Sequence, residues 1–473
     1  MAAIALQGCA LEQAGMDRAS VRDVAQYLPI QQPQAGNADH GVEGWRVFND
    51  AELNQLLNLA FEHNPSLGVA RQRLIQAHAL ARKQGSDQYL DLDFSTGLAR
   101  HFRSDSDEEN NASIGLVARY ELDLWGLVDA LTTAAELDAL ATQMELDTAA
   151  ISLTAEIAST WFNFVEQQGQ QALIREQLQT NQTMLALLER RFVLGKVFSA
   201  DVLRQKSLIT QTQQSLNAVS ASIASFRHRL AVLIGQLPLE DPPMAGLSHT
   251  PLVLPRNLPE APAIPDTASL VSQLILQRPD IRKAFAEVEA ADQRLAAAIA
   301  ARYPRLDLSF SISNAADSVS DLFRDWLASI AADIALPLID GGSRRADVAL
   351  SASQRVEKWL LYQHAILLAV EEIQTTLSDA RYQSKKLALL REQQALSDSI
   401  VNQLQLRYQQ GGVSFLEVLS ALEQQQQTER SLLTAKLNLL LNRVTLNRVL
   451  ATGWQKRPSN RLDEASQTLS NED

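Results

Sequence analysis

The segment RRFVLGKVFSADVL at Arg190–Leu203 recurs in altered form as LRYQQGGVSFLEVL at Leu406–Leu419, with a numbering offset of 216. Arginine, glycine, an acidic residue and leucine occupy matching places in the two copies. Each copy lies within a long run of residues that favour helices. Because glycine adopts positive φ at little cost, Gly195 and Gly411 predict tight turns between antiparallel helices.

The repetition extends well beyond these two segments. Gly126 in YELDLWGLVDA and Gly342 in LPLIDGGSRRA share the same offset, while NPSLGVARQRL at 64–74 resembles RPDIRKAFAEV at 278–288 with an offset of 214. A repeat of this length indicates a duplicated domain. We expect an N-terminal lipoprotein-like segment and extended arm at 1–50, a first repeat at 51–236, a proline-rich connector at 237–266, a second repeat at 267–453 and a polar tail at 454–473.

Both repeats contain unusually long helical stretches. Residues 343–410 and 413–452 lack glycine and proline, and 127–168 and 196–234 behave in the same way, with Gly169 and Gly195 as the expected interruptions between them. At about 1.5 Å per residue, a helix of about 65 residues is on the order of 100 Å long. A coiled-coil seam is indicated by seven-residue spacing of Leu137, Met144, Ile151, Ala158 and Val165.

Four segments of about ten residues alternate apolar and polar side chains instead, as in YLDLDFSTGLA and RLDLSFSIS. They predict β-hairpins at about 89–124 and 305–338, with polar connecting loops at 103–111 and 314–325. This length and alternation match the strands of an outer-membrane barrel, although an ordinary sheet packed on a core alternates similarly. Interfacial belts are the expected location of the aromatic side chains Tyr120, Phe323 and Trp326.

Four strands cannot close a barrel, and open edges in lipid would leave backbone groups unpaired. Three chains would supply twelve strands. The predicted fold is therefore mainly α with a four-stranded transmembrane β contribution: a trimeric 12-stranded β-barrel continued by a long α-helical coiled-coil barrel, built from two tandem repeats.

Bulk composition excludes several classes of protein. The chain of 473 residues is 46% hydrophobic and carries a net charge of −13, so a nucleic-acid partner is not expected. No apolar run reaches the roughly 20 residues of a membrane-spanning helix. The single cysteine, Cys9, follows Leu6-Gln7-Gly8 and resembles a lipoprotein acylation site, with an incidental thiol as the alternative.

Residue patterns for chemistry are missing. The seven histidines show no metal-ligand spacing, and no catalytic set, metal site or cofactor site is indicated, so we expect neither enzymatic activity nor a cofactor. The run EQQQQTER at 423–430 is interpreted as a polar helix face directed toward water or a lumen.

Seven segments in order and spacing, including the two glycine turns, NPSLGVARQRL, YELDLWG, RPDIRKA, YPRLDLSFS and LPLIDGG, resemble the TolC family of outer-membrane efflux proteins, and most closely its lipid-anchored OprM-like branch. The resemblance covers about 53–450. It implies a homotrimer in the outer membrane of a Gram-negative bacterium, lipid-anchored, with a periplasmic helical tunnel. Its implied partners are outer-membrane lipid, a periplasmic adaptor (membrane fusion) protein and an inner-membrane pump of the RND, MFS or ABC type.

The resemblance also implies roles for particular residues. Carboxylates after the second tip ring the closed tunnel entrance, which implicates Glu417 in constriction; Ser420 stands where some relatives carry a second acid. Three Glu417 side chains in a ring would raise one another's pKa. The implied adaptor-docking residues at the tips are Arg191, Gly195, Val197, Ser199, Asp201, Arg407, Gly411 and Val413. For Arg191 and Asp201, helix capping alone is the alternative.

The expected function is passive export of small molecules, such as drugs and toxic compounds, through the outer-membrane channel of a tripartite efflux system. A protein-secretion conduit is the nearer alternative. A soluble coiled-coil scaffold is a more distant one, and it gives no reason for the four alternating segments.

Overall fold

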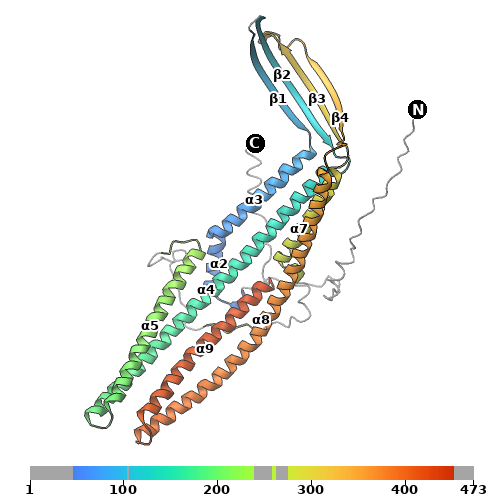
Figure 1. Ribbon diagram of the computed structural model, residues 1–473. Coiled ribbons are helices and arrows are strands. Elements are labelled where there is room, and N and C mark those ends of the chain that lie inside the picture. The colour runs from blue at the N-terminus through green and yellow to red at the C-terminus, as the bar shows by residue number, and fades with distance from the viewer. Residues whose placement is uncertain (1–45, 104–105, 239–257, 263–274, 452–473) are drawn as a thin grey trace.

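The computed structural model describes residues 46–103, 106–238, 258–262 and 275–451, and shows a long helical body with a small sheet at one end (Figure 1). The mainly helical class with a four-stranded contribution is confirmed. The elements in chain order are η1 (Arg46–Phe48), α2 (Ala51–His63), α3 (Pro65–Gly85), η2 (Ser86–Gln88), β1 (Asp91–Arg103), β2 (Ser106–Leu122), α4 (Leu127–Val193), α5 (Ser199–Leu233), α7 (Pro279–Ala300), β3 (Arg305–Ala316), η3 (Val319–Asp321), β4 (Leu327–Ala335), α8 (Ser343–Gln409) and α9 (Phe415–Val449).

Two helices of 67 residues each, α4 and α8, run the length of the helical body. Near the sheet they pack with α3 and α7, and toward the other end with α5 and α9. Neighbouring helices in the lower part follow the order α5, α4, α9, α8, which forms a single layer of two helical hairpins (Figure 1). Both hairpins therefore end together, far from the sheet.

In each repeat, a side chain just before α3 or α7 donates a hydrogen bond to a backbone carbonyl at the end of α5 or α9, respectively. We call this hydrogen bond the clamp. The Asn64 side chain, just before α3, donates from Nδ2 to the carbonyl of Leu233 at 2.8 Å. Arg278, just before α7, donates from Nη1 to the carbonyl of Val449 at 2.9 Å. The numbering offset is 214 between the donors and 216 between the acceptors, so the duplication seen in the sequence is also present in the hydrogen bonding.

The largest apolar cluster lies where α2, α4, α5 and α9 meet. Trp161 and Phe162 of α4 are fully buried there. The Trp161 indole donates to Asp50 Oδ2 at 2.8 Å, and Asp50 also caps α2 by accepting from the backbone N–H of Leu53 at 2.9 Å. This core fixes the level at which the two helical hairpins join.

The four strands form one antiparallel sheet in the order β1-β2-β3-β4. Phe94 pairs with Leu116, Leu116 pairs with Ile312, and Ile312 pairs with Ala328. Directly opposed residues share a face, so the apolar side chains of all four strands line up on one side of the sheet.

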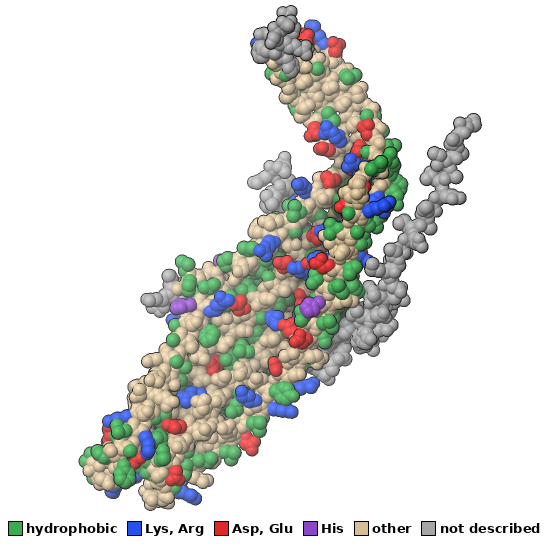
Figure 2. All heavy atoms as spheres, viewed as in Figure 1, with side chains coloured by type: hydrophobic (Ala, Val, Ile, Leu, Met, Phe, Trp, Pro, Cys, Tyr) green, Lys and Arg blue, Asp and Glu red, His purple; other side chains and the backbone are tan. Residues whose placement is uncertain are grey.

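That apolar side has no protein covering it within the described protomer. Leu98 is 76% exposed, Ile330 84% and Ile334 74%. Figure 2 shows charged side chains near the ends of the sheet and few along its middle. A water-facing surface of this kind would be unfavourable, whereas lipid is a suitable neighbour. None of the helices in the described ranges has the length and apolar character to cross a membrane.

Several predicted boundaries were wrong. The connector expected at 103–111 is mostly strand, because β2 begins at Ser106 and Asn110 pairs with Arg100. The connector expected at 314–325 shares its first residues with β3 and then forms η3. Gly169 does not interrupt α4, since a single helical glycine costs only about 1 kcal/mol and the surrounding turns continue through it.

Candidate functional site

The first helical hairpin turns at Gly195, whose φ is +67°. Its N–H donates to the carbonyl of Phe192 at 2.8 Å, and the N–H of Lys196 donates to the carbonyl of Arg191 at 2.9 Å. These two bonds form a Schellman motif, which satisfies carbonyls left free at the end of α4. A residue with a Cβ would be strained at this φ.

The second hairpin repeats this geometry at Gly411, whose φ is +77°. Its N–H donates to the carbonyl of Tyr408 at 3.1 Å, and the N–H of Gly412 donates to the carbonyl of Arg407 at 2.9 Å. Arg191 and Arg407 therefore contribute equivalent carbonyls to equivalent turns. Both side chains lie in the last turn of their helix, where a cation is favourable.

An acidic side chain caps the start of each returning helix. Asp201 Oδ2 accepts from the N–H of Phe198 at 3.3 Å. Glu417 Oε1 accepts from the N–H of Ser414 at 3.1 Å and from its hydroxyl at 2.9 Å. The capping that sequence alone left as an alternative role for Asp201 is thus present, and Glu417 shares it.

The hydrogen bonds from the Ser414 N–H and hydroxyl lower the pKa of Glu417. This direction is opposite to the one expected for three carboxylates in a ring, because within one protomer the nearest groups are donors. Both Glu417 and Ser420 are exposed on α9. In a ring of three protomers, repulsion between the Glu417 carboxylates would oppose this lowering of the pKa.

The two tips touch each other. The Arg191 guanidinium lies 4.8 Å from the centroid of the Tyr408 ring, a cation–π contact between the end of α4 and the end of α8. Behind this contact, Leu188, Leu208, Phe415 and Leu419 form a buried cluster that joins both hairpins. Sequence alone did not identify Tyr408, because its partner comes from the other repeat.

The outer surfaces of the tips differ in polarity. The first tip exposes apolar side chains, with Val193 84%, Leu194 68% and Phe198 82% exposed. The equivalent positions of the second tip hold glutamine, glutamine and serine. Ser199 is exposed beside the first set, whereas Val197 and Val413 are half-buried, and Val197 packs against the buried cluster. The two tips thus offer chemically different surfaces to anything that binds this end.

Above the tips, α4 and α9 meet along a row of polar side chains, which we call the polar seam (Glu166, Gln170, Gln177, Asn181, Gln426, Glu429, Arg430 and Thr434). The first five are buried, Glu429 and Arg430 are half-buried, and Thr434 is exposed. Gln426 Nε2 donates to Asn181 Oδ1 at 3.1 Å, and Gln177 Nε2 donates to Glu429 Oε2 at 2.8 Å. Arg430 Nη1 donates to Gln177 Oε1 at 3.2 Å. The polar seam lies between the apolar cluster around Trp161 and the one at the tips.

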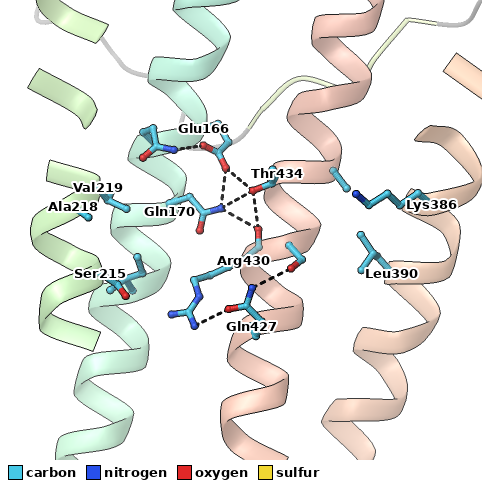
Figure 3. A pocket seen from close by; sticks show the side chains of 14 residues that line it. Glu166, Gln170, Ser215, Ala218, Val219, Lys386, Leu390, Gln427, Arg430 and Thr434 are labelled. Atoms are coloured by element: carbon cyan, nitrogen blue, oxygen red, sulfur yellow. Dashed lines mark hydrogen bonds between the residues drawn. The ribbon is translucent and has the colours of Figure 1, made fainter. Parts of the chain in front are cut away.

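The upper part of the polar seam borders a recess of about 600 Å³ lined by all four helices of the layer (Figure 3). Gln170 Nε2 donates to Glu166 Oε1 at 2.8 Å and to the carbonyl of Arg430 at 3.0 Å, and the Thr434 hydroxyl donates to Glu166 Oε1 at 3.2 Å. Lys386 of α8 lies across the recess from this network. The recess therefore carries charges of both signs beside apolar side chains such as Ile174, Val219 and Leu390.

Burial changes the proton affinity of two groups in the polar seam. Burial raises the pKa of Glu429, with Asp398 and Glu176 adding to the effect, while the hydrogen bond from Gln177 opposes it. Burial also lowers the pKa of the Arg430 guanidinium. Charged groups in this position are costly to desolvate, so amide and hydroxyl partners hold the two hairpins together here more weakly than an apolar interface would.

The interpretation of EQQQQTER as a wholly solvated face was wrong in part. Gln426 is 3% exposed because it packs against Asn181 of α4, and Thr428, on a different side of α9, is 2% exposed. The signal that could have identified the polar seam is the matching polar run on α4, in which glutamine and asparagine recur from Gln170 to Asn181. Cys9 lies outside the described residues, and no group of three potential metal ligands occurs within them.

Comparison with known proteins covers nearly the whole chain. The family model described as outer membrane efflux protein matches residues 56–236 and 270–452. The pyoverdine export outer membrane protein OpmQ of Pseudomonas aeruginosa is 27% identical over 87% of both chains. The cation efflux system protein CusC of Escherichia coli O157:H7 is 25% identical over 96% of this chain and 98% of its own.

Solved structures extend the likeness to three dimensions. The outer membrane protein VceC of Vibrio cholerae superposes with a TM-score of 0.79, at 24% identity, over 88% of this chain and 100% of its own. The same long helices and small sheet are therefore present in a structure determined by crystallography.

Proposed function

Because the chain belongs to the outer membrane efflux protein family, we propose that it conducts small molecules passively, without catalysing a reaction of its own. It is the outer-membrane channel of a tripartite efflux system, and it works as a homotrimer with a periplasmic adaptor protein and an inner-membrane pump. The observation that carries the proposal is the exposed apolar face of a sheet with two open edges, at the end of a helical body about 100 Å long.

The four-helix layer supports a route for cargo. Residues from α4, α5, α8 and α9 line one recess, so the layer is concave on that side. In a closed ring of three protomers, the concave side faces the axis. Glu166, Lys386 and Arg430 place charges of both signs beside apolar side chains on this side of the layer, which suits cargo of varied polarity.

The relatives indicate the range of cargo. Their names specify pyoverdine export, solvent efflux and cation efflux. A conduit whose wall combines charged, polar and apolar side chains is compatible with such breadth, and we propose that the partner pump selects what is exported. A protein-secretion role remains the alternative, and the cargo of the cognate pump distinguishes the two.

The tips are the proposed docking surface for the adaptor. The turns at Gly195 and Gly411 leave Ser199 and the side chain of Arg407 exposed, and the half-buried Arg191, Asp201, Val197 and Val413 flank them. Glu417 and Ser420 are the proposed lining of the tunnel entrance, and they lie in the first two turns of α9. Cys9 is the proposed site of lipidation.

The function is tested by extraction and complementation together. Detergent extraction from outer membranes should yield a species near three times 52.1 kDa. A strain lacking its own channel of this class, but containing the cognate adaptor and pump, should regain resistance to small toxic compounds when it expresses the chain. Recovery of a soluble single protomer would contradict the channel, and restored secretion of a protein without restored resistance would favour the alternative.

A further inference from the structure

The sheet of one protomer ends in two edge strands, β1 and β4, whose outer backbone groups have no strand beside them within the described chain. In lipid each unpaired group costs several kcal/mol, so closure of the trimer must pair β4 of one subunit with β1 of the next. This inference rests on the proposed trimeric channel and goes beyond it, because it specifies which residues face each other across the subunit boundary.

The internal duplication gives the rule for the pairing. A β1 residue has its equivalent in β3 at its number plus 214, and a β2 residue has its equivalent in β4 at its number plus 216. The observed pair Phe94–Leu116 therefore corresponds to Leu308–Ala332, which is also an observed pair. Leu98–Ala112 converts in the same way into Ile312–Ala328, also observed. The first hairpin and the second are therefore equivalent residue by residue, with no slip between them.

The same equivalence applies to the boundary between the hairpins. Within one chain, β2 pairs with β3, and the equivalents of these strands are β4 and β1. The observed pair Arg119–Ser309 converts into Ala335 and Ser95, and Gly115–Ser313 converts into Ala331 and Ala99.

We propose that β4 of each subunit pairs antiparallel with β1 of the next in this register, with Ala335 opposite Ser95 and Ala331 opposite Ala99. The partner is a second copy of this chain, and three such contacts close the ring. The contact is head-to-tail, so each subunit contributes β4 to one neighbour and β1 to the other.

Side-chain character agrees with the proposed register. The observed pair Tyr120–Leu308 converts into Leu336 opposite Phe94, which brings together two exposed apolar side chains on the lipid-facing side. A slip of one residue would place Ile334 and Leu336 on the side opposite to Phe94, because strand side chains alternate with period two. Registers that differ by two residues keep every side chain on the same face of the sheet. Among these registers, the internal duplication selects the one proposed here.

Four cysteine substitutions provide the test. Ser95→Cys with Ala335→Cys, and Ala99→Cys with Ala331→Cys, are the two matched pairs; directly opposed residues have Cα atoms about 4.5–5.5 Å apart, which suits a disulfide. Exchanging partners gives Ser95→Cys with Ala331→Cys, and Ala99→Cys with Ala335→Cys. These use the same four changes but place the sulfurs four residues, or about 13 Å, out of register.

Slips of two residues have their own probes. Asp333→Cys combined with Ser95→Cys detects a slip in one direction, and combined with Ala99→Cys it detects a slip in the other. The native chain already contains one cysteine, Cys9. Variants that carry only one of these substitutions therefore measure the background cross-linking. Mild oxidation of membranes, followed by denaturing electrophoresis without reductant, reads out covalent dimers and closed trimers.

We expect covalent trimers from both matched pairs, at least tenfold more than from either exchanged pair, and nothing larger than a trimer. Cross-linking dominated by an Asp333→Cys combination, or by the exchanged pairs, would overturn the register while leaving the channel function intact. A trimer-sized species before oxidation that shows no cross-link in any pair would also overturn it. Absence of that trimer-sized species in the unmodified protein would instead count against the proposed function.

Discussion

At the residue scale, the two tip glycines carry a backbone requirement that a glycine inside a helix does not. Gly195 and Gly411 have positive φ, with open space where a Cβ would stand, so the constraint is conformational and no steric clash with neighbours is involved. Gly68, in the first turns of α3, also has open space but has helical backbone. Substitutions at these three positions therefore distinguish the effect of backbone strain from the effect of side-chain packing.

Gly195→Ala and Gly411→Ala should each destabilise their tip by about 1–2 kcal/mol, because an L-residue is strained in the left-handed region. Gly68→Ala should be neutral or stabilising by up to about 1 kcal/mol, since alanine favours a helix. Gly411→Pro also removes the N–H that binds Tyr408, and it should abolish export. Export assays with trimer detection check these outcomes; loss of the trimer in Gly411→Pro would indicate a folding role instead.

Glu417→Gln should reduce cation selectivity in planar bilayers if the carboxylate lines the tunnel entrance. Because hydrogen bonds from Ser414 hold the pKa of Glu417 below its ordinary value, the wild-type selectivity should persist to a more acidic pH than an unperturbed glutamate would allow. The matched control is Asp201→Asn, which removes the equivalent cap from the first tip. Equal effects of the two substitutions would show capping to be the whole role of Glu417.

At the element scale, much could be predicted because local rules dominate. The long helices follow from breaker-free sequence, and the turns follow from Gly195 and Gly411. The strand ends were mispredicted because the polar stretch from Ser106 to Asn111 is held in β2 by cross-strand pairing, which local polarity does not report. The polar seam and the Arg191–Tyr408 contact escaped prediction because each joins residues from different repeats of the chain.

The clamp at the start of α7 is an ionic version of the one at α3. Arg278 is buried, and besides the Val449 carbonyl it binds Asp280 Oδ2 at 2.7 Å and Glu372 Oε2 at 3.1 Å. Burial alone would raise the pKa of Asp280, but the hydrogen bond and charge of Arg278 outweigh it and hold that pKa below its ordinary value.

Arg278→Met should therefore destabilise the protein by about 2–3 kcal/mol at neutral pH, below the usual cost of breaking a buried ion pair because Asp280 and Glu372 are partly exposed. Since the pKa of Asp280 is depressed in the folded state, its contribution is complete above the unfolded value near 3.9 and is lost as the pH falls through the folded value. The difference between variant and wild type should shrink below about pH 4 in denaturant unfolding.

The neutral clamp supplies the control for this pH effect. Asn64→Ala removes the bond to Leu233 and the cap of α3, at a cost of about 1–2 kcal/mol. That loss should not vary between pH 3 and 7, because asparagine does not titrate. A parallel pH dependence in both variants would contradict the ionic explanation for Arg278.

The polar seam makes the α4–α9 contact sensitive to unmatched changes. Asn181 and Gln426 are buried and bind each other, so Gln426→Leu should cost about 1–3 kcal/mol by leaving the Asn181 amide short of a partner. Combining it with Asn181→Leu should recover at least about 1 kcal/mol, because the two apolar side chains pack together. A double-mutant cycle measures this coupling, and strict additivity would show that the pair does not act as a unit.

At the scale of the whole molecule, the register proposed between subunits fixes the shape of the barrel. A path from Leu92 across Ala118, Phe310 and Ile330 reaches Arg100 of the next subunit, eight positions further along β1. Because three subunits close the ring, the total stagger of the strands around the barrel is three times the stagger of one subunit. With strands about 4.8 Å apart and about 3.3 Å of rise per residue, the total corresponds to a tilt of roughly 55°.

Such a tilt explains why β1, β2 and β3 are longer than the ten or so residues expected for a barrel tilted at roughly 40°, whereas β4 has only 9 residues. An apolar band about 25 Å tall then requires about 13 residues per strand. The observed lengths of β1, β2 and β3 are 13, 17 and 12 residues. The sequence pattern predicted strands but not their tilt, because tilt depends on how all twelve strands are staggered.

The same stagger widens the channel. Twelve strands at roughly 55° give a backbone-to-backbone diameter of about 31 Å, whereas a register two residues shorter at each boundary gives about 27 Å. Electron microscopy of the detergent-solubilised trimer should therefore show the wider barrel. The narrower diameter would mean that the subunit boundaries slip relative to the internal repeat, since the contacts within each protomer already fix the remaining pairings.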